Sequence, residues 1–265
     1  MIGSSERPID RHAVRVSDPL PIFRDTEESS HLRECCQSER DTRMIRLHVI
    51  DRTNRDAYAD AIDQHYVLRK KIYIDEQRWS ALRATNGREI DQFDTDSTVY
   101  LLAIGADGEV AGGTRLLPSL GPTLLSEVFP QLARERGFER APEIWEWTRF
   151  FVAPRFREDK RLSRVAGIVA AGMVEYCLDQ RIPRMNVVAE AYWIPKVSAL
   201  GWRPRPLGLP LAHEGLSICA FTIEMTEKAL QATRAVYGID APSLVRPKRP
   251  VPCYDHPASD RALSA

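Results

Sequence analysis

The chain has 265 residues, of which 43% are hydrophobic, so it can form one substantial domain. Lysine plus arginine and aspartate plus glutamate both number 37, which excludes binding to nucleic acid or to an anionic membrane through overall charge. The five cysteines lack the spacing of a zinc site or a disulfide framework, and no apolar run reaches the roughly 18 to 20 residues of a membrane span, so we expect a cytoplasmic protein with reduced thiols and no bound metal.

The two ends of the chain differ in composition from its middle. Residues 1–43 are rich in charge, serine and proline and show no sustained period, so we predict a disordered N-terminal extension. Residues 240–265 are rich in proline and are predicted to form a loose C-terminal tail. The residues between them, 44–239, are predicted to form one domain.

The first part of this domain alternates a strand, a helix and a loop. Apolar residues alternate in Met44–Ile50, which predicts a strand, and recur at helical spacing in Tyr58–Tyr73, which predicts a helix with Arg69 near its C-terminal end. The segment Ile74–Asp96 has no regular period and carries Trp79. We interpret it as a lid over a cleft.

The central elements are strands. Asp107-Gly108 predicts a hairpin turn between strands that begin at Val99 and Val110, and short helical pieces are expected in Leu124–Arg136. The aromatic and β-branched run Pro142–Pro154 then predicts a buried strand.

A basic run follows this strand, at the start of a helix whose apolar face extends from Leu162 to Tyr176. Such a run is either a solvated N-terminal turn or a site for phosphopantetheine, coenzyme A or an acidic carrier protein, because phosphate groups bind well at helix N-termini. The sequence leaves both interpretations open. The basic residues are Arg155, Arg157, Lys160, Arg161 and Arg164.

The last elements complete an α/β pattern. A strand is predicted at Met185–Glu190, a short helix at Trp193–Leu200 and a strand at Leu216–Met225. The order of strand, basic turn, long helix, strand and short helix resembles the acetyltransferase (GNAT) architecture. We therefore predict a GNAT-like mixed central sheet flanked by helices, a three-layer sandwich.

Charged residues interrupt three apolar segments of this domain. Glu146 and Arg149 lie inside the central strand, Arg115 lies in another strand, and three carboxylates lie in E-I-D-Q-F-D, Glu89–Asp94. Strand alternation places Glu146 and Thr148 on one face and Arg149 on the other, unless a bulge re-aims it. Burial of so many charges is costly, so we expect them to meet in one cleft, with isolated structural ion pairs as the alternative.

These segments are part of an ordered set of motifs: Leu68-Arg69 with Tyr73 and Trp79, E-I-D-Q-F-D, R-L-L-P followed by Gly121-Pro122 and Phe129-Pro130, W-E-W-T-R-F, and Leu200-Gly201-Trp202. The set resembles the acyl-homoserine lactone synthase family (LuxI type), whose members make quorum-sensing autoinducers. The resemblance runs from about Met44 to Ile239. Because it begins at Met44, two alternatives stay open for the preceding residues, a flexible extension or translation that naturally starts at Met44.

The resemblance implies roles for the residues at matching positions. It implies binding of S-adenosylmethionine by Arg69, Tyr73 and Trp79, although Tyr73 stands where the family usually has Phe. An acyl pocket is implied for Trp147, Thr148 and Val187, although Thr148 stands where Ser is usual. Catalytic and charge-pairing roles are implied for Glu146, Arg149, Asp91, Asp94 and Arg115.

The activity implied by the resemblance is acyl transfer from acyl-CoA or acyl-carrier protein to the amine of S-adenosylmethionine, followed by lactone closure with release of methylthioadenosine. It needs no cofactor, because S-adenosylmethionine is a substrate. Glu146 is the expected general base, directly or through a water. Val187 stands where Thr often accompanies 3-oxo chains, so an acyl group unsubstituted at the β-carbon is expected. The W-E-W-T-R variant resembles the branch that takes short branched or aryl groups from coenzyme A.

Two other functions stay open. A generic N-acetyltransferase shares the architecture but does not require so many paired charges in the lid. A non-catalytic module that binds S-adenosylmethionine requires no base, and the intact Glu146 and Arg149 argue against it. The chain has no G-x-S-x-G, P-loop or G-x-G-x-x-G motif, and its histidines lack metal-ligand spacing.

Overall fold

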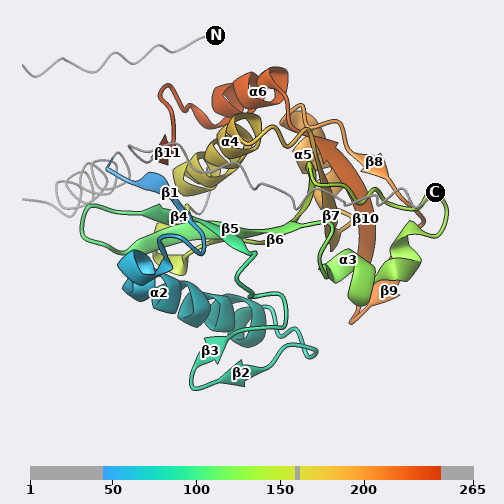
Figure 1. Cartoon of the computed structure of the whole chain (residues 1–265), viewed down its shortest axis with the longest axis horizontal. Helices are drawn as coiled ribbons and strands as arrows, with labels where there is room; N and C mark the ends of the chain where they lie inside the picture. The colour runs from blue at the N-terminus through green and yellow to red at the C-terminus, as the bar shows by residue number, and fades with distance from the viewer. Residues whose placement is uncertain (1–43, 159–161, 246–265) are drawn as a thin grey trace, which may run out of the picture. The chain divides into compact units, whose positions relative to one another are not determined.

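The computed structural model describes residues 44–158 and 162–245, in which a mixed sheet lies between helices (Figure 1). Nine strands of the described residues form this sheet, in the order β11-β1-β4-β5-β6-β7-β10-β8, with β9 paired to β10. The long strands are β1 (Arg46–Ile50), β4 (Val99–Ile104), β5 (Val110–Pro118), β6 (Ile144–Val152), β7 (Arg184–Glu190) and β10 (Leu216–Glu224). The short ones are β8 (Arg205–Pro206), β9 (Leu211–His213) and β11 (Leu244–Val245), and β2 (Ala84–Thr85) pairs separately with β3 (Arg88–Glu89).

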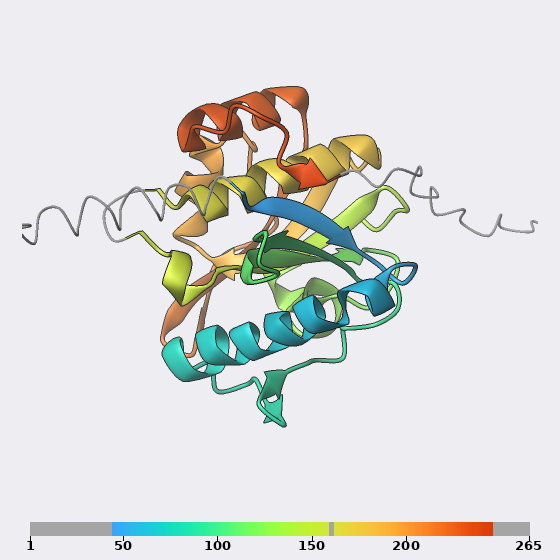
Figure 2. The same cartoon turned by 90° about the vertical axis from the view of Figure 1, so that its left-hand side faces the viewer.

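Helices cover both faces of the sheet, and the predicted three-layer arrangement is confirmed (Figure 2). On one face lies α2 (Ala59–Arg69), which is preceded by a 3₁₀ turn, η1 (Arg55–Tyr58), and continues as a π-helix, η2 (Lys70–Glu76). On the other face lies α4 (Arg164–Asp179), against which α6 (Glu227–Tyr237) packs. The short helices are α3 (Leu124–Glu127), η3 (Pro130–Ala133), η4 (Pro154–Phe156) and α5 (Trp193–Ala199).

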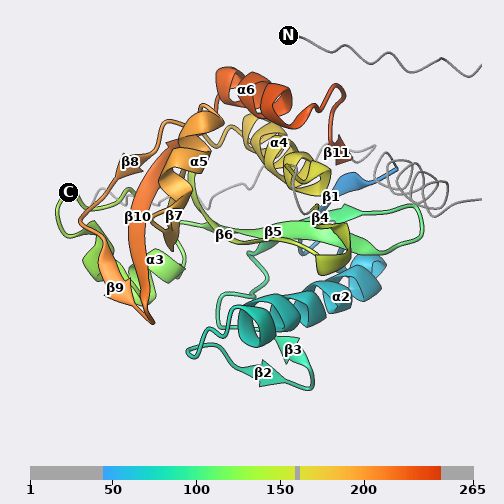
Figure 3. The same cartoon turned by 180° about the vertical axis from the view of Figure 1, so that it is seen from behind.

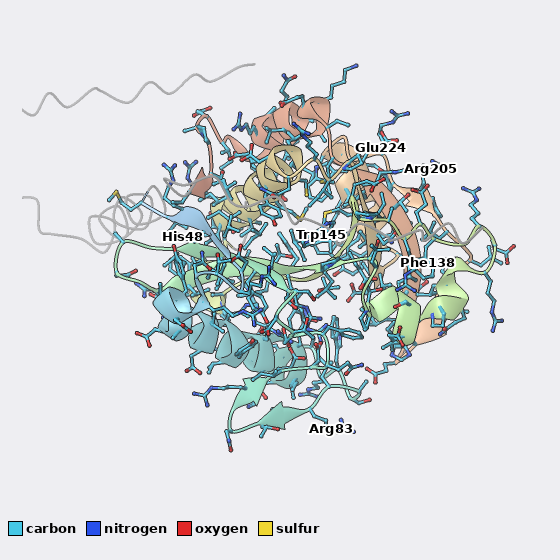
Figure 4. The ribbon with its side chains drawn as sticks, in the orientation of Figure 1. His48, Arg83, Phe138, Trp145, Arg205 and Glu224 are labelled. Atoms are coloured by element: carbon cyan, nitrogen blue, oxygen red, sulfur yellow. The ribbon has the colours of Figure 1, made fainter. Side chains whose placement is uncertain are left out.

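Strand β4 shows why both faces must be covered. All of its residues are buried, and its side chains alternate between two hydrophobic clusters. Val99 and Leu101 belong to the cluster that includes α4, whereas Tyr100 and Leu102 belong to the cluster that includes α2. A strand that is apolar on both faces is stable only inside a layered structure. Trp145 of β6 belongs to the α4 cluster and is labelled in the interior in Figure 4.

The sheet opens between β6 and β7. These strands pair in parallel from Ile144 with Arg184 to Trp147 with Val187, and the pairing ends there although both strands continue. Beyond this point the two strands can accommodate a ligand between them. Figures 1 and 3 show α3 beside β7 and β10.

A β-bulge in β6 re-aims Arg149. The register between β5 and β6 shifts here, so Arg149 and Phe150 stand opposite Thr114 of β5. Arg149 has φ of 53°, in the left-handed region, which costs a residue with a side chain about 1 kcal/mol or more. Strict alternation would place Arg149 on the same face as Trp147. The bulge that the sequence left open is present, and the side chain points toward Glu89 instead.

The C-terminal boundary predicted at residue 239 is wrong. Leu244 and Val245 form β11, which pairs in parallel with β1, and the buried carboxylate of Glu175 on α4 accepts the backbone N–H of Ser243 and of Leu244, each at 3.0 Å. The folded domain therefore extends at least to Val245. The predicted extension at residues 1–43 and the rest of the predicted tail lie outside the described residues.

Within the described ranges, no helix combines the length and the apolar character that crossing a bilayer would need.

Candidate active site

Six charged residues from four segments meet in one cluster, as the sequence predicted. Arg69 ends α2, Arg115 lies in β5, Arg149 lies in the bulge of β6, and the acids lie in β3 and the loop that follows it. Three arginines face three carboxylates, so the formal charges of the cluster cancel. The ion pairs are Arg69–Glu89, Arg69–Asp91, Arg69–Asp94, Arg115–Asp91, Arg115–Asp94, Arg149–Glu89 and Arg149–Asp91.

Asp91 is the acid of this cluster that reaches the cleft. Its two oxygens accept from Arg115 Nη1 and Nη2 at 2.6 and 3.0 Å, a bidentate pair, and Oδ2 also accepts from Arg149 Nη2 at 2.8 Å. The Asp91 side chain is 14% exposed, whereas the side chains of Asp94, Arg69 and Arg115 are 0% exposed. Asp91 and Arg149 therefore present the charges of the cluster to a ligand, and the other members hold them in place.

The arginines keep the buried acids ionised. Burial alone would raise the pKa of Asp94, but the positive charges of Arg69 and Arg115 lower that pKa well below its ordinary value. Burial likewise opposes ionisation of Glu89, and Arg149 and Arg69 lower the pKa of its carboxyl group. The cluster is therefore a fixed array of charges at neutral pH.

Tyr73 and Trp79 form an aromatic wall beside the charges. Their rings stack with centroids 5.0 Å apart and an interplanar angle of 26°. The Arg149 guanidinium lies over the Tyr73 ring at 5.4 Å, and the Tyr73 hydroxyl donates to the backbone carbonyl of Phe150 at 3.0 Å. A phenylalanine could not make this last bond, so Tyr73 ties η2 to the bulged strand.

A cavity of about 330 Å³ joins this charged region to an apolar one. Its charged end is lined by Asp91, Gln92, Arg149, Tyr73 and Trp79. Its apolar end lies where β6 and β7 separate and is lined by Trp147, Phe150, Val187, Trp193 and Ile218. The three residues predicted for the acyl pocket, Trp147, Thr148 and Val187, all line the cavity.

Contacts between two distant segments close part of the cavity rim. Glu214 at the tip of the β9–β10 hairpin accepts the backbone N–H of Ser80 at 3.2 Å and also accepts from the Ser80 hydroxyl. Glu214 and the residues on either side of Ser80 line the cavity. Arg83, labelled in Figure 4, lies in the same segment as Ser80, at the outer edge of the molecule.

Glu146 is buried, but its neighbours differ from those expected. Its two carboxylate oxygens accept the backbone N–H of Leu124 at 2.7 Å and of Leu125 at 3.0 Å, at the start of α3. Burial raises its pKa to about 7, while these backbone N–H groups and the Thr123 side chain oppose the rise. Glu146 is not one of the residues that line the cavity, although Leu124 is. Among the described residues no arginine forms an ion pair with Glu146, and the backbone N–H groups at the start of α3 take the place of the arginine that the ion-pair alternative required.

The described residues of the basic run after β6, Arg155, Arg157 and Arg164, do not line the cavity. Arg155 pairs with Glu109, Arg157 pairs with Glu76 at 2.7 Å, and Arg164 donates to the backbone carbonyl of Gly238 at 3.3 Å. Lys160 and Arg161 lie outside the described residues. The structure therefore leaves both interpretations of this run open.

Glu89 was expected in the charged cluster, but no individual role was assigned to it from the sequence. It is 1% exposed and accepts from both Arg69 and Arg149, so it joins the end of α2 to the bulge of β6. The sequence did carry a signal, because Glu89 is the first of three carboxylates in E-I-D-Q-F-D. Among the residues that the structure describes, no group of three or more His, Cys, Asp or Glu side chains could hold a metal ion.

A sequence model of the autoinducer synthase family matches residues 53–233 of the chain. The chain is 39% identical to isovaleryl-homoserine lactone synthase of Bradyrhizobium diazoefficiens over 204 residues, which cover 77% of this chain and 90% of that one. It is 29% identical to acyl-homoserine-lactone synthase of Acinetobacter nosocomialis over 162 residues, covering 59% of this chain and 88% of that one.

Solved structures show the same relationship. BjaI, a CoA-dependent acyl-homoserine lactone synthase solved with S-adenosylmethionine (SAM) and isopentyl-CoA, superposes with a TM-score of 0.70 at 36% identity, covering 75% of this chain and 92% of that one. MesI, also a CoA-dependent acyl-homoserine lactone synthase, gives a TM-score of 0.69 at 40% identity, covering 75% and 98% of the two chains. The similarity therefore covers three quarters of this chain rather than a single motif.

Proposed function

Because the chain belongs to the autoinducer synthase family, we propose that it makes an acyl-homoserine lactone from S-adenosylmethionine and an acyl-CoA. The observation that supports this most directly is the single cavity with a charged end and an apolar end. A zwitterionic, sulfonium-bearing substrate and an acyl chain require these two environments side by side.

The charged end suits the methionyl part of S-adenosylmethionine. Arg149 offers a cation for the substrate carboxylate, and Asp91 offers an anion for its ammonium group. The stacked rings of Tyr73 and Trp79 suit the sulfonium, because an aromatic face attracts a cation. Arg69, Arg115 and Asp94 act through Asp91 and Glu89, since they are buried behind them.

The first step of the reaction is acyl transfer. The substrate ammonium must lose a proton, after which its nitrogen attacks the thioester carbonyl, a C–N bond forms and the thiol of the donor leaves. Glu146 is our candidate for the base. Each of its oxygens already accepts one backbone N–H, so we place a water between Glu146 and the amine. Its pKa of about 7 suits a group that must accept a proton near neutral pH.

The second step closes the lactone. An oxygen of the methionyl carboxylate attacks the γ-carbon, the bond between that carbon and the sulfonium sulfur breaks, and neutral methylthioadenosine leaves. No oxidant or reductant is needed, so the reaction requires no cofactor. The sulfonium is already a good leaving group, and the contribution of the protein is to fold the substrate chain into a reactive pose.

Coenzyme A is the donor that we favour over a carrier protein. BjaI and MesI are described as CoA-dependent, and BjaI was solved with isopentyl-CoA. The basic run from Arg155 to Arg164 would then contact the phosphates of coenzyme A. The apolar Val187 in the cavity wall favours an acyl group without a 3-oxo substituent, and the aromatic lining favours a short branched or aryl group.

The test uses the purified full chain with S-adenosylmethionine and either acyl-CoA or the same acyl group on carrier protein, and identifies products by mass spectrometry. We expect an acyl-homoserine lactone, formed faster from isovaleryl-CoA than from the carrier protein. An acylated amine without lactone would indicate a generic N-acyltransferase, and binding of S-adenosylmethionine without any product would indicate a non-catalytic module.

A further inference from the structure

We propose that Thr114 is a positioning residue that determines acyl selectivity, because it fixes the ring of Trp147 in the wall of the cavity. The Trp147 indole N–H donates to the Thr114 hydroxyl oxygen at 2.7 Å. Trp147 lines the cavity, whereas Thr114 is completely buried and does not. This inference rests on the proposed function, since it assigns the apolar end of the cavity to the acyl group.

The hydrogen bonds of Thr114 define one orientation. Its hydroxyl proton goes to the backbone carbonyl of Thr148 at 2.8 Å, which leaves an oxygen lone pair for the Trp147 indole. The site exists because of the bulge, where Thr114 stands opposite Arg149 and Phe150. If the Trp147 ring turned away, its buried N–H would lose its hydrogen-bond partner, which is unfavourable away from water.

Neighbouring rings hold the other sides of Trp147. Phe150 at 5.5 Å, Trp193 at 6.0 Å and Trp202 at 5.4 Å between centroids all meet it edge to face. Phe150 and Trp193 also line the cavity and contact each other at 5.7 Å. These rings form one side of the apolar end of the cavity and pack closely against one another. The hydrogen bond to Thr114 sets the orientation of the Trp147 ring among them.

A Trp147 ring held in one orientation limits the size of the acyl group that the cavity can accept. The cavity of about 330 Å³ must hold the reacting parts of two substrates, so its apolar end suits a compact acyl group better than a long straight chain. A Trp147 ring that could move would lengthen this end. Loss of the Thr114 bond should therefore raise the use of long chains relative to short ones.

The test replaces Thr114 by valine, which keeps the β-branched shape and removes the acceptor. We expect Thr114→Val to raise the ratio of kcat/KM for octanoyl-CoA to that for isovaleryl-CoA by roughly 5-fold, the equivalent of one hydrogen bond of ordinary strength. Thr114→Ser keeps the acceptor and should retain the wild-type ratio. Should Thr114→Val fail to fold, Trp147→Phe, which keeps a ring but lacks the N–H, should show the same shift.

Thr233→Val is the matched control. The Trp202 indole donates to the Thr233 hydroxyl at 2.8 Å, and that hydroxyl donates to the Ala229 carbonyl at 2.7 Å. Thr233 therefore has the same hydrogen-bond pattern as Thr114. Trp202 does not line the cavity. Trp202 meets the acyl end of the cavity through the ring of Trp147, so both valine variants should lower Tm, but Thr114→Val should shift the acyl ratio clearly more than Thr233→Val does.

An unchanged ratio in Thr114→Val, or an equal shift in Thr233→Val, would overturn the inference while leaving the proposed function intact. Wild-type protein that makes no lactone from either thioester would contradict the proposed function, and the inference with it.

Discussion

Arg149 donates to Asp91 at 2.8 Å from a bulge in β6, where its backbone adopts a left-handed conformation that few arginines adopt. Without the bulge, its side chain would point to the opposite face of the sheet, among the apolar residues under α4. The strained backbone conformation of Arg149 therefore places its positive charge at the cavity.

Replacement of Arg149 by lysine should lower kcat/KM by about 10- to 100-fold. Lysine keeps the positive charge but cannot donate to Glu89 and Asp91 at the same time in the geometry of the planar guanidinium. Hydrogen bonds to charged groups contribute roughly 1.5 to 3 kcal/mol each. Arg184→Lys is the control, since Arg184 pairs with Glu139 at a partly exposed site away from the cavity. Equal activity of the two variants would show that the reaction does not depend on the guanidinium hydrogen bonds from Arg149 to Glu89 and Asp91.

Glu89→Gln should destabilise the domain as well as reduce activity. Glu89 pairs with both Arg69 and Arg149, so its neutralisation removes one anionic partner from each of two buried cations. Breaking a buried ion pair in this way lowers the free energy of unfolding by about 3 to 5 kcal/mol. Thermal unfolding should show a lower Tm than that of the wild type at pH 7.

The difference in thermal stability between wild type and Glu89→Gln should depend on pH. The pKa of Glu89 lies below its ordinary value of 4.5 in the folded protein, so its stabilising contribution is present above that value and is lost as the pH falls through the folded pKa. The difference in Tm between wild type and Glu89→Gln should therefore shrink as the pH falls below about 4.5. A difference that stays constant through this range would contradict the ionised state of Glu89.

Glu146→Gln should lower the rate of methylthioadenosine release by roughly 10² to 10⁴, the usual contribution of a positioned general base. The wild-type rate should rise as the pH increases through about 7, because the carboxylate form accumulates above the pKa of Glu146. The variant should lack this inflection and recover partly at higher pH, where more of the substrate amine is already deprotonated.

Stability separates this role from a purely structural one. The folded pKa of Glu146, about 7, lies above its ordinary 4.5, so its ionisation makes the fold less stable as the pH rises between these values. Gln can accept only one of the two α3 N–H groups, so a moderate loss of Tm is also expected. A Glu146→Gln variant that melts much earlier yet turns over at nearly the wild-type rate would show that Glu146 only anchors α3.

Val187→Thr should increase the use of 3-oxoacyl-CoA relative to the unsubstituted thioester. Val187 is buried in the cavity wall and offers no hydrogen bond, whereas a threonine hydroxyl of similar size can donate to a 3-oxo group. The measurement is the ratio of kcat/KM for the two thioesters in both proteins. If the wild type already prefers the 3-oxo substrate, the polarity of this position does not control selectivity.

The sequence predicted most of the sheet and the meeting of its buried charges, because apolar periodicity and the cost of burying ions are local and general signals. The strands β4, β5, β6, β7 and β10 and the helix α4 lie close to the expected ranges, whereas β8 and β9 were not predicted. Long-range contacts account for the differences. The pairing of Leu244 with β1 depends on Glu175, and α6 was not predicted as an element at all.

The site itself was only partly predictable. Arg149 and Thr148 are adjacent in the sequence, and no local signal states whether a bulge brings their side chains to the same face. The buried position of Glu146 was correctly expected, but its bonds to the start of α3 depend on how a helix twenty residues earlier packs against β6. Side-chain partners of this kind are set by tertiary packing rather than by pattern.

The central claim is that one cavity couples acyl transfer to lactone closure on the same S-adenosylmethionine. The most direct measurement follows coenzyme A thiol, methylthioadenosine and acyl-homoserine lactone together during turnover of isovaleryl-CoA by the full chain. We predict that the three products form in equal amounts at all times. Release of coenzyme A thiol without methylthioadenosine, with the acyl group found on an amine but no lactone, would contradict the account.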